Sequence, residues 1–309
     1  MLANIAYRLE RSTVCCAQDA SQASGTGLLT RNTQNRLSPY KGNSASHAKL
    51  VCAALIFGAA SLFTMSLSSA PALANSSGGI MGSDDRVKID SRKAPWTAVG
   101  RVNIINGTHC TGTLISPTRV LTAAHCLWNA KNSKWIPANW LHFMAGYYRG
   151  DAVSSFAIVS YTLAPKYPAK GGAGPKHINN DWAILNLRRP AEESLGIIPV
   201  VSLTSAQISA IPEHPQIVLQ AGYSHDMAQR LSLNPDCRII GLNKTRYLLA
   251  HNCDAVEGDS GSPILQISDG QMSIVGLHVG TAHLKAIKGQ RREKYGVAVP
   301  ASEFIDFLQ

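Results

Sequence analysis

The sequence predicts an all-β protein built from two six-stranded antiparallel β-barrels packed together, with a short C-terminal helix. Short apolar runs recur from position 96 onward and are separated by Gly, Pro and polar turns, as expected for strands. The runs fall into two sets on either side of a linker rich in Pro, Ser and Glu at about 189–215. Many short strands at this spacing indicate an all-β fold, and two such sets indicate paired barrels.

The first barrel is expected over 96–200 and the second barrel, with the helix, over 201–309. The strands expected in the first barrel are 96–105, 111–116, 120–124, 141–148, 155–163 and 182–187. Those expected in the second are 217–221, 238–242, 247–250, 263–267, 272–279 and 295–299. The helix is expected over 300–308, where Phe304, Ile305 and Leu308 share one helical face after Ser302.

Residues 1–74 have the layout of a leader that ends in a signal peptide. A polar stretch ends at Lys49, an uncharged apolar h-region follows at about 50–67, and Ala72-Leu73-Ala74 resembles a cleavage site, which predicts export. The alternative is a membrane anchor, because 50–70 carries no charge. The small-residue exit favours cleavage, which would leave Asn75 first. Either translation starts further downstream, or residues 1–48 are an extended n-region.

The charge pattern excludes one class of partner. The chain carries a net charge of +10 with 16% charged residues, yet it has no basic stripe with interleaved aromatic residues, so nucleic acid is not expected as a partner. The densest basic patch lies at 285–294. It is either a solvated loop or a rim that attracts acidic substrate.

Four of the seven cysteines lie outside the leader, at Cys110, Cys126, Cys237 and Cys253. Four cysteines allow three pairings, and disulfides would fit a secreted or periplasmic protein. A metal site is the alternative, but it is disfavoured because no close Cys-x-x-Cys pair is present.

Three motifs carry side chains suited to nucleophilic catalysis. Gly258-Asp259-Ser260-Gly261 predicts an exposed turn that presents a hydroxyl and free N–H groups, and Thr-Ala-Ala-His-Cys places His125 upstream. Asp181 lies between them. A serine hydroxyl needs an imidazole to take its proton, and the imidazole needs a carboxylate to orient it.

These motifs, in the order His, Asp, Ser, resemble the trypsin-like (chymotrypsin-fold) serine peptidases from about Trp96 to the C-terminus. Ser-Gly-Ser-Pro at 260–263, Val-Gly-Leu-His-Val-Gly around His278 and Gly-Ser-Asp-Asp-Arg at 82–86 are similar to the bacterial glutamyl endopeptidases. The resemblance implies a monomeric secreted endopeptidase that cleaves proteins or peptides through an acyl-enzyme, without a cofactor, and that meets the membrane only during export.

The resemblance also assigns roles to individual residues. Ser260 is the nucleophile, His125 the general base and acid, and Asp181 its orienting carboxylate. The N–H groups of Gly258 and Ser260 form the oxyanion hole. The family pattern pairs Cys110 with Cys126, which leaves Cys237 with Cys253.

The residues implied for substrate binding are Asp254, His278, Gly280 and Gly296, with the glycines keeping the pocket open. Asp254 stands where trypsin carries a carboxylate and favours a basic residue before the cleaved bond. His278 stands where glutamyl endopeptidases carry a histidine and favours an acidic one. We give His278 precedence. A third interpretation pairs Asp254 with His278 at the pocket wall.

The segment 75–95 is a possible propeptide. In many family members the carboxylate before the nucleophile, here Asp259, pairs with a new α-amino terminus, and Ile80 is the best apolar candidate for that terminus. The enzyme would then be made as a zymogen.

Two other classes of function remain open. Some family members are non-catalytic binding proteins, and the long leader is compatible with an exported toxin or adhesin. Both predict that an organophosphonate does not label Ser260.

Overall fold

This computed structural model describes residues 78–308, except 106, 169, 171–176 and 284–293. The leader at 1–74 and nearly all of the basic patch at 285–294 lie outside the described residues. Within the described part of the chain, no helix is long and apolar enough to cross a membrane.

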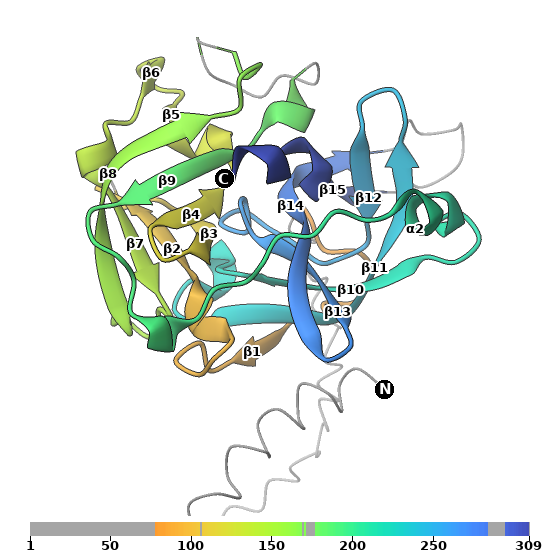
Figure 1. The fold of residues 1–309 in the computed structure, drawn as a ribbon, viewed down its shortest axis with the longest axis horizontal. Coiled ribbons are helices and arrows are strands. Elements are labelled where there is room, and N and C mark those ends of the chain that lie inside the picture. Colours follow the sequence, from red (N-terminus) through yellow and green to blue (C-terminus); the bar gives the residue numbers. More distant parts are fainter. Residues whose placement is uncertain (1–77, 106, 169, 171–176, 284–293, 309) are drawn as a thin grey trace, which may run out of the picture. The chain divides into compact units, whose positions relative to one another are not determined.

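Six antiparallel strands close the first barrel in the order β2-β3-β4-β9-β8-β7 (Figure 1). Alternate side chains of each strand face the barrel core. In β7, Leu141, Phe143 and Ala145 are buried, whereas His142 is exposed, as the strand period of two requires. The strands are β2 (Val99–Ile104), β3 (His109–Ser116), β4 (Arg119–Thr122), β7 (Leu141–Ala145), β8 (Ser154–Leu163) and β9 (Ala183–Leu187).

The second barrel has the strand order β11-β10-β13-β14-β15-β12, and pairing of β12 with β11 closes it. The short β1 (Val87–Ile89) pairs with β11 as a seventh strand. The barrel strands are β10 (Gln216–Gly222), β11 (Leu231–Asn243), β12 (Leu248–His251), β13 (Pro263–Ser268), β14 (Gln271–His283) and β15 (Lys294–Pro300). The predicted pair of six-stranded barrels is confirmed.

Several local elements differ from the sequence-based expectation. The C-terminal helix takes the form of two single 3-10 turns, η7 (Ala301–Glu303) and η8 (Ile305–Phe307). Phe304 between them has φ −130°, outside the helical range, and packs with Phe307 on the buried Trp182 ring. The α-helix of the described residues, α2 (Ser205–Ala210), lies in the linker. A capping box between Thr204 and Gln207 starts it.

Other elements were not anticipated. Strand β11 begins seven residues before the expected position 238 because β1 pairs with Leu231–Leu233 and the end of β10 pairs with Ser232–Asn234. A small two-stranded sheet, β5 (Trp128–Asn129) with β6 (Lys134–Trp135), follows the first-barrel strand β4.

Both expected disulfides are formed, Cys110–Cys126 and Cys237–Cys253. Each closes a loop with a sequence separation of 16. Such bonds persist in an oxidising compartment, which agrees with an extracellular location.

Candidate active site

Ser260 lies in the loop that joins β12 to β13, flanked by glycines in conformations that other residues rarely adopt. Gly258 and Gly261 have φ angles of +94° and +82°, in the left-handed region. A Cβ on Gly261 would come within 2.3 Å of Thr111 O. The N–H of Thr111, on β3, donates to Ser260 O at 2.9 Å. The first barrel therefore holds the serine loop of the second barrel.

His125 and Asp181 form a two-point contact at the edge of the first barrel. His125 lies in the 3-10 turn η2 (Ala124–Leu127), just after β4, and Asp181 is buried with 1% of its surface exposed. Asp181 Oδ1 accepts from the His125 backbone N–H at 2.8 Å, and Oδ2 accepts from Nδ1 at 2.7 Å. Because Nδ1 holds a proton in this pair, Nε2 is the nitrogen available to accept one.

Two opposing effects set the pKa of His125. Burial disfavours the charged imidazolium and lowers the pKa, but the charge and the hydrogen bond of Asp181 raise it. Their balance leaves the pKa of His125 above its usual value, because the carboxylate stabilises the protonated ring.

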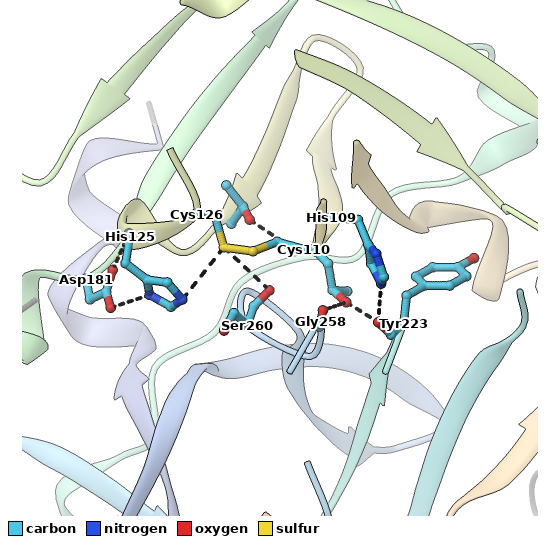
Figure 2. The surroundings of a disulfide bond; sticks show 10 residues. His109, Cys110, His125, Cys126, Asp181, Tyr223, Gly258 and Ser260 are labelled. Carbon is cyan, nitrogen blue, oxygen red and sulfur yellow. Dashed lines mark hydrogen bonds and ion pairs between the residues drawn. A yellow bond between two sulfur atoms is a disulfide. The ribbon is translucent and has the colours of Figure 1, made fainter. Parts of the chain in front are cut away.

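The Cys110–Cys126 disulfide adjoins both the imidazole and the serine loop (Figure 2). Cys126 Sγ lies 3.9 Å from His125 Nε2 and 3.9 Å from Ser260 O. Among the residues that the structure describes, no hydrogen bond joins Ser260 Oγ to His125 Nε2, and catalytic contacts are often loose before substrate binds. The two cysteines and His125 lie close enough for a metal cluster, but disulfide sulfurs do not supply the thiolates that such a site needs.

The N–H groups of Gly258 and Ser260 belong to peptides whose carbonyl groups are already bound. Glu257 O accepts from His225 N–H at 2.6 Å, and the carbonyl preceding Ser260 accepts from Ser262 N–H at 2.9 Å. The N–H and C=O of a trans peptide point in opposite directions, so these bonds set the directions of the two N–H groups. Within the described ranges neither N–H has an acceptor, which leaves both able to bind an oxyanion.

Asp259 is buried, and its hydrogen-bond partners in the described chain are uncharged. Ser224 Oγ lies 2.8 Å from Oδ2 and 3.0 Å from Oδ1, and Val256 N–H donates to Oδ2 at 2.9 Å. Burial raises the pKa of Asp259 to about 7, and the hydrogen bonds oppose this effect only in part. Ile80, the candidate for the α-amino terminus that would pair with Asp259, stands within the chain here and has 8% of its surface exposed.

A pocket of about 370 Å³ opens beside Ser260. His278 and Gly280 line it, whereas Asp254 and Gly296 are not among its lining residues. The lining residues are Gly78, Gly79, Ala255, Val256, Glu257, Ser260, His278, Gly280 and Thr281.

Asp254 binds the N-terminal segment. Its Oδ1 accepts from Met81 N–H at 2.5 Å and its Oδ2 from Asp85 N–H at 3.0 Å. The next residue, Ala255, donates its N–H to Gly79 O at 3.1 Å. The carboxylate is 4% exposed, so its charge serves to hold the chain that forms one wall of the pocket.

His278 is bound to a second buried histidine, and its pairing with Asp254, the third interpretation above, is absent from the described contacts. His251 Nε2 lies 3.0 Å from His278 Nδ1, and Cys253 N–H donates to His251 Nδ1 at 3.2 Å. Because His251 Nδ1 accepts, its Nε2 carries the proton and donates to His278 Nδ1. His278 therefore has a protonated Nε2 available at the pocket.

Burial keeps both rings neutral. It lowers the pKa of His251 to about 3 and the pKa of His278 well below its usual value. Gly296 makes room for this pair, since a Cβ there would lie 2.0 Å from the His251 ring.

Residues 84–308 match the family model described as Trypsin. This chain belongs to the trypsin family. It is 24% identical over 226 residues to a glutamyl endopeptidase of Bacillus licheniformis, covering 73% of this chain and 66% of that protein. It is 30% identical to serine protease 23 of Rattus norvegicus, covering 60% of this chain and 50% of that protein. The chain thus spans less than two thirds of the length of these two relatives.

Two further matches bear on fold and function. Glucanase inhibitor protein 4 of Phytophthora infestans is 24% identical, covering 58% of this chain and 70% of that protein. A solved structure of a Glu endopeptidase in complex with MPD matches with a TM-score of 0.56 at 21% identity, covering 74% of this chain and 98% of that chain. At this identity the structural match shows the fold.

Sequence reasoning missed several residues around this trypsin-family site. His251 had a usable signal, because it lies two residues after the buried Leu249 and so shares its face of β12. Ser224, which binds Asp259, had none, because its partner is 35 residues away along the chain. Arg86 stands in the Gly-Ser-Asp-Asp-Arg motif at 82–86, but that motif gave no sign of its partner Asp226, 140 residues away.

Proposed function

We propose that this protein is a serine endopeptidase that hydrolyses peptide bonds through an acyl-enzyme. The observation that carries the proposal is the two-point contact of Asp181 with His125, which leaves Nε2 as the proton acceptor beside the Ser260 loop. Acyl transfer needs this base, a serine hydroxyl and N–H donors for the oxyanion.

Each step follows from the proposed roles. Ser260 Oγ bonds to the substrate carbonyl carbon while its proton passes to His125 Nε2, and the N–H groups of Gly258 and Ser260 bind the carbonyl oxygen as it becomes negative. His125 then gives that proton to the leaving amine as the C–N bond breaks. Water then attacks the ester carbon while His125 takes its proton, and His125 returns that proton to Ser260 Oγ as the C–Oγ bond breaks and the acid is released. Asp181 stabilises the imidazolium in both halves of the reaction.

For specificity we propose a preference for Glu or Asp before the cleaved bond. His278 can donate from its neutral Nε2–H to a carboxylate in the pocket, while Asp254 is occupied by the backbone N–H groups of Met81 and Asp85. Glu257 at the pocket is exposed and so its charge is screened by water. A panel of peptides with Glu, Asp, Lys, Arg or Phe at this position tests the assignment, and preference for Lys or Arg overturns it.

We further propose that the mature enzyme is secreted or periplasmic, acts as a monomer on protein or peptide substrates and retains the segment from Gly78. Strand β1 pairs with β11, and Gly78 and Gly79 line the pocket. Removing this segment as a propeptide would open the pocket wall. The N-terminal residue of the exported protein checks this proposal, because a start after Gly78 contradicts it.

A non-catalytic binding protein is the second candidate, favoured by the similarity to a protein named as a glucanase inhibitor. Labelling by a peptidyl organophosphonate separates the two. The peptidase predicts one covalent label that is lost in Ser260→Ala and greatly slowed in His125→Ala. An unlabelled wild-type protein that binds a partner instead supports the second candidate.

A further inference from the structure

Arg86 is a buried guanidinium that joins the N-terminal segment to the turn η6 (His225–Met227). Only 2% of its side chain is exposed. It binds Asp84, two residues earlier, through Nε and Nη2 at 2.9 and 2.8 Å. It also binds Asp226, on η6, through Nη1 and Nη2 at 3.0 and 2.7 Å. A fork of this kind fixes the orientation of both groups.

The turn η6 in turn holds a peptide of the oxyanion site. His225, next to Asp226, donates its N–H to Glu257 O at 2.6 Å. The first barrel supports the same region, because His109 Nε2–H donates to Tyr223 O at 2.8 Å. These contacts tie η6 to Arg86 on the N-terminal segment, and tie Tyr223, two residues before η6, to His109 on β3.

The Glu257–Gly258 peptide depends on such support for its direction. Gly258 has no side chain, so its backbone can adopt positive as well as negative φ angles. A larger residue does not fit, because a Cβ there would lie 2.4 Å from Tyr223 O. With Glu257 O bound to His225 N–H, the Gly258 N–H points the opposite way. Without that bond, nothing in the described contacts of this peptide selects the orientation.

We propose that Arg86 and Asp226 are positioning residues for the oxyanion site: their ion pair fixes η6, and η6 fixes the Gly258 N–H in its donating direction. The proposal rests on the serine peptidase function stated above. It gives the N-terminal segment a role in transition-state stabilisation, besides its place in the pocket wall.

The chain provides a matched control for the test. Arg92 forms the same fork with Asp90, also two residues earlier, through Nε and Nη2 at 2.8 and 2.9 Å, but it has no second carboxylate in the described contacts. We expect Arg86→Met and Asp226→Asn each to lower kcat by about tenfold or more, up to the roughly 10²–10³ that corresponds to loss of a whole donor. KM should stay within about twofold, and Arg92→Met should match the wild type.

A peptide aldehyde gives a second readout, because its hemiacetal oxygen needs the Gly258 N–H as an oxyanion does. Its inhibition constant should rise by the same factor as kcat falls, whereas a matching peptide acid should bind unchanged. The double variant should be no worse than either single variant, since both remove one link. Should Arg86→Met fail to fold, Asp226→Asn, which alters a carboxylate 45% exposed, carries the test.

The possible results distinguish failure of the positioning role from failure of the proposed peptidase function. If the wild type hydrolyses peptides and takes the phosphonate label, but Arg86→Met and Asp226→Asn behave like Arg92→Met, the positioning role is wrong and the peptidase stands. A uniform rise in KM with unchanged kcat also overturns it. If the wild type is neither labelled nor active, both proposals fall together.

Discussion

The buried carboxylate of Asp259 makes the stability of this protein depend on pH in an unusual direction. Most acidic groups stabilise a fold more as pH rises, because their pKa is lowered on folding. Burial instead raises the pKa of Asp259 from 3.8 to about 7. The folded state therefore binds the proton more tightly than the unfolded state, and this group's contribution to stability falls as pH rises from about 4 to 7.

The size of the effect follows from the shift. About three pKa units at 1.36 kcal/mol each correspond to about 4 kcal/mol, and no discount for solvent screening applies because Asp259 is 2% exposed. Asn cannot ionise, and its Oδ1 can still accept from Ser224 or Val256. The free energy of unfolding of Asp259→Asn minus that of the wild type should thus increase by about 4 kcal/mol between pH 4 and pH 8.

Urea unfolding at pH 4, 5, 6, 7 and 8 measures this difference, with both proteins in a Ser260→Ala background to prevent self-digestion. Titration of every other group cancels between the two proteins. A flat difference refutes the reasoning. If the free-energy difference instead decreases as pH rises, a cation lies beside Asp259, as the activation hypothesis with an Ile80 ammonium requires. A cation would lower the pKa of Asp259 and so reverse the sign of its pH dependence.

Four further predictions concern the site and the residues that support it. The acidic limb of kcat/KM against pH should have its midpoint above 6.5, because the raised pKa of His125 keeps the base protonated to higher pH. The variant Asp181→Asn should have a kcat lower by about 10⁴. Gly261→Ala should lower the unfolding free energy by about 1–3 kcal/mol through its φ of +82° alone, and loss of the phosphonate label should accompany it. Replacing both Cys237 and Cys253 by Ala should cost about 3 kcal/mol by denaturant unfolding, for a loop with separation 16; an unchanged midpoint contradicts this.

The positions of most strands could be predicted from local sequence patterns. Strand alternation, as in β7, needs only that every second side chain face the core, so most barrel strands could be located within a few residues. The exceptions depend on distant partners. The start of β11 is a strand because β1 and the end of β10 pair with it, and the C-terminal segment bends at Phe304 to pack on Trp182.

By itself the sequence determined the two-barrel fold, the disulfide partners through a family resemblance, and the three motifs that meet at the barrel junction. The strands and the motifs are local patterns: a strand shows in a short run of residues, and Gly258-Asp259-Ser260-Gly261 is four consecutive residues. Tertiary structure alone decided that Asp254 faces Met81 and Asp85, and that His278 pairs with His251. It also decided that Arg86 reaches Asp226. A buried charge or imidazole takes whichever partner the folded chain brings within about 3 Å, and residues 27 to 173 positions apart leave no local trace of that choice.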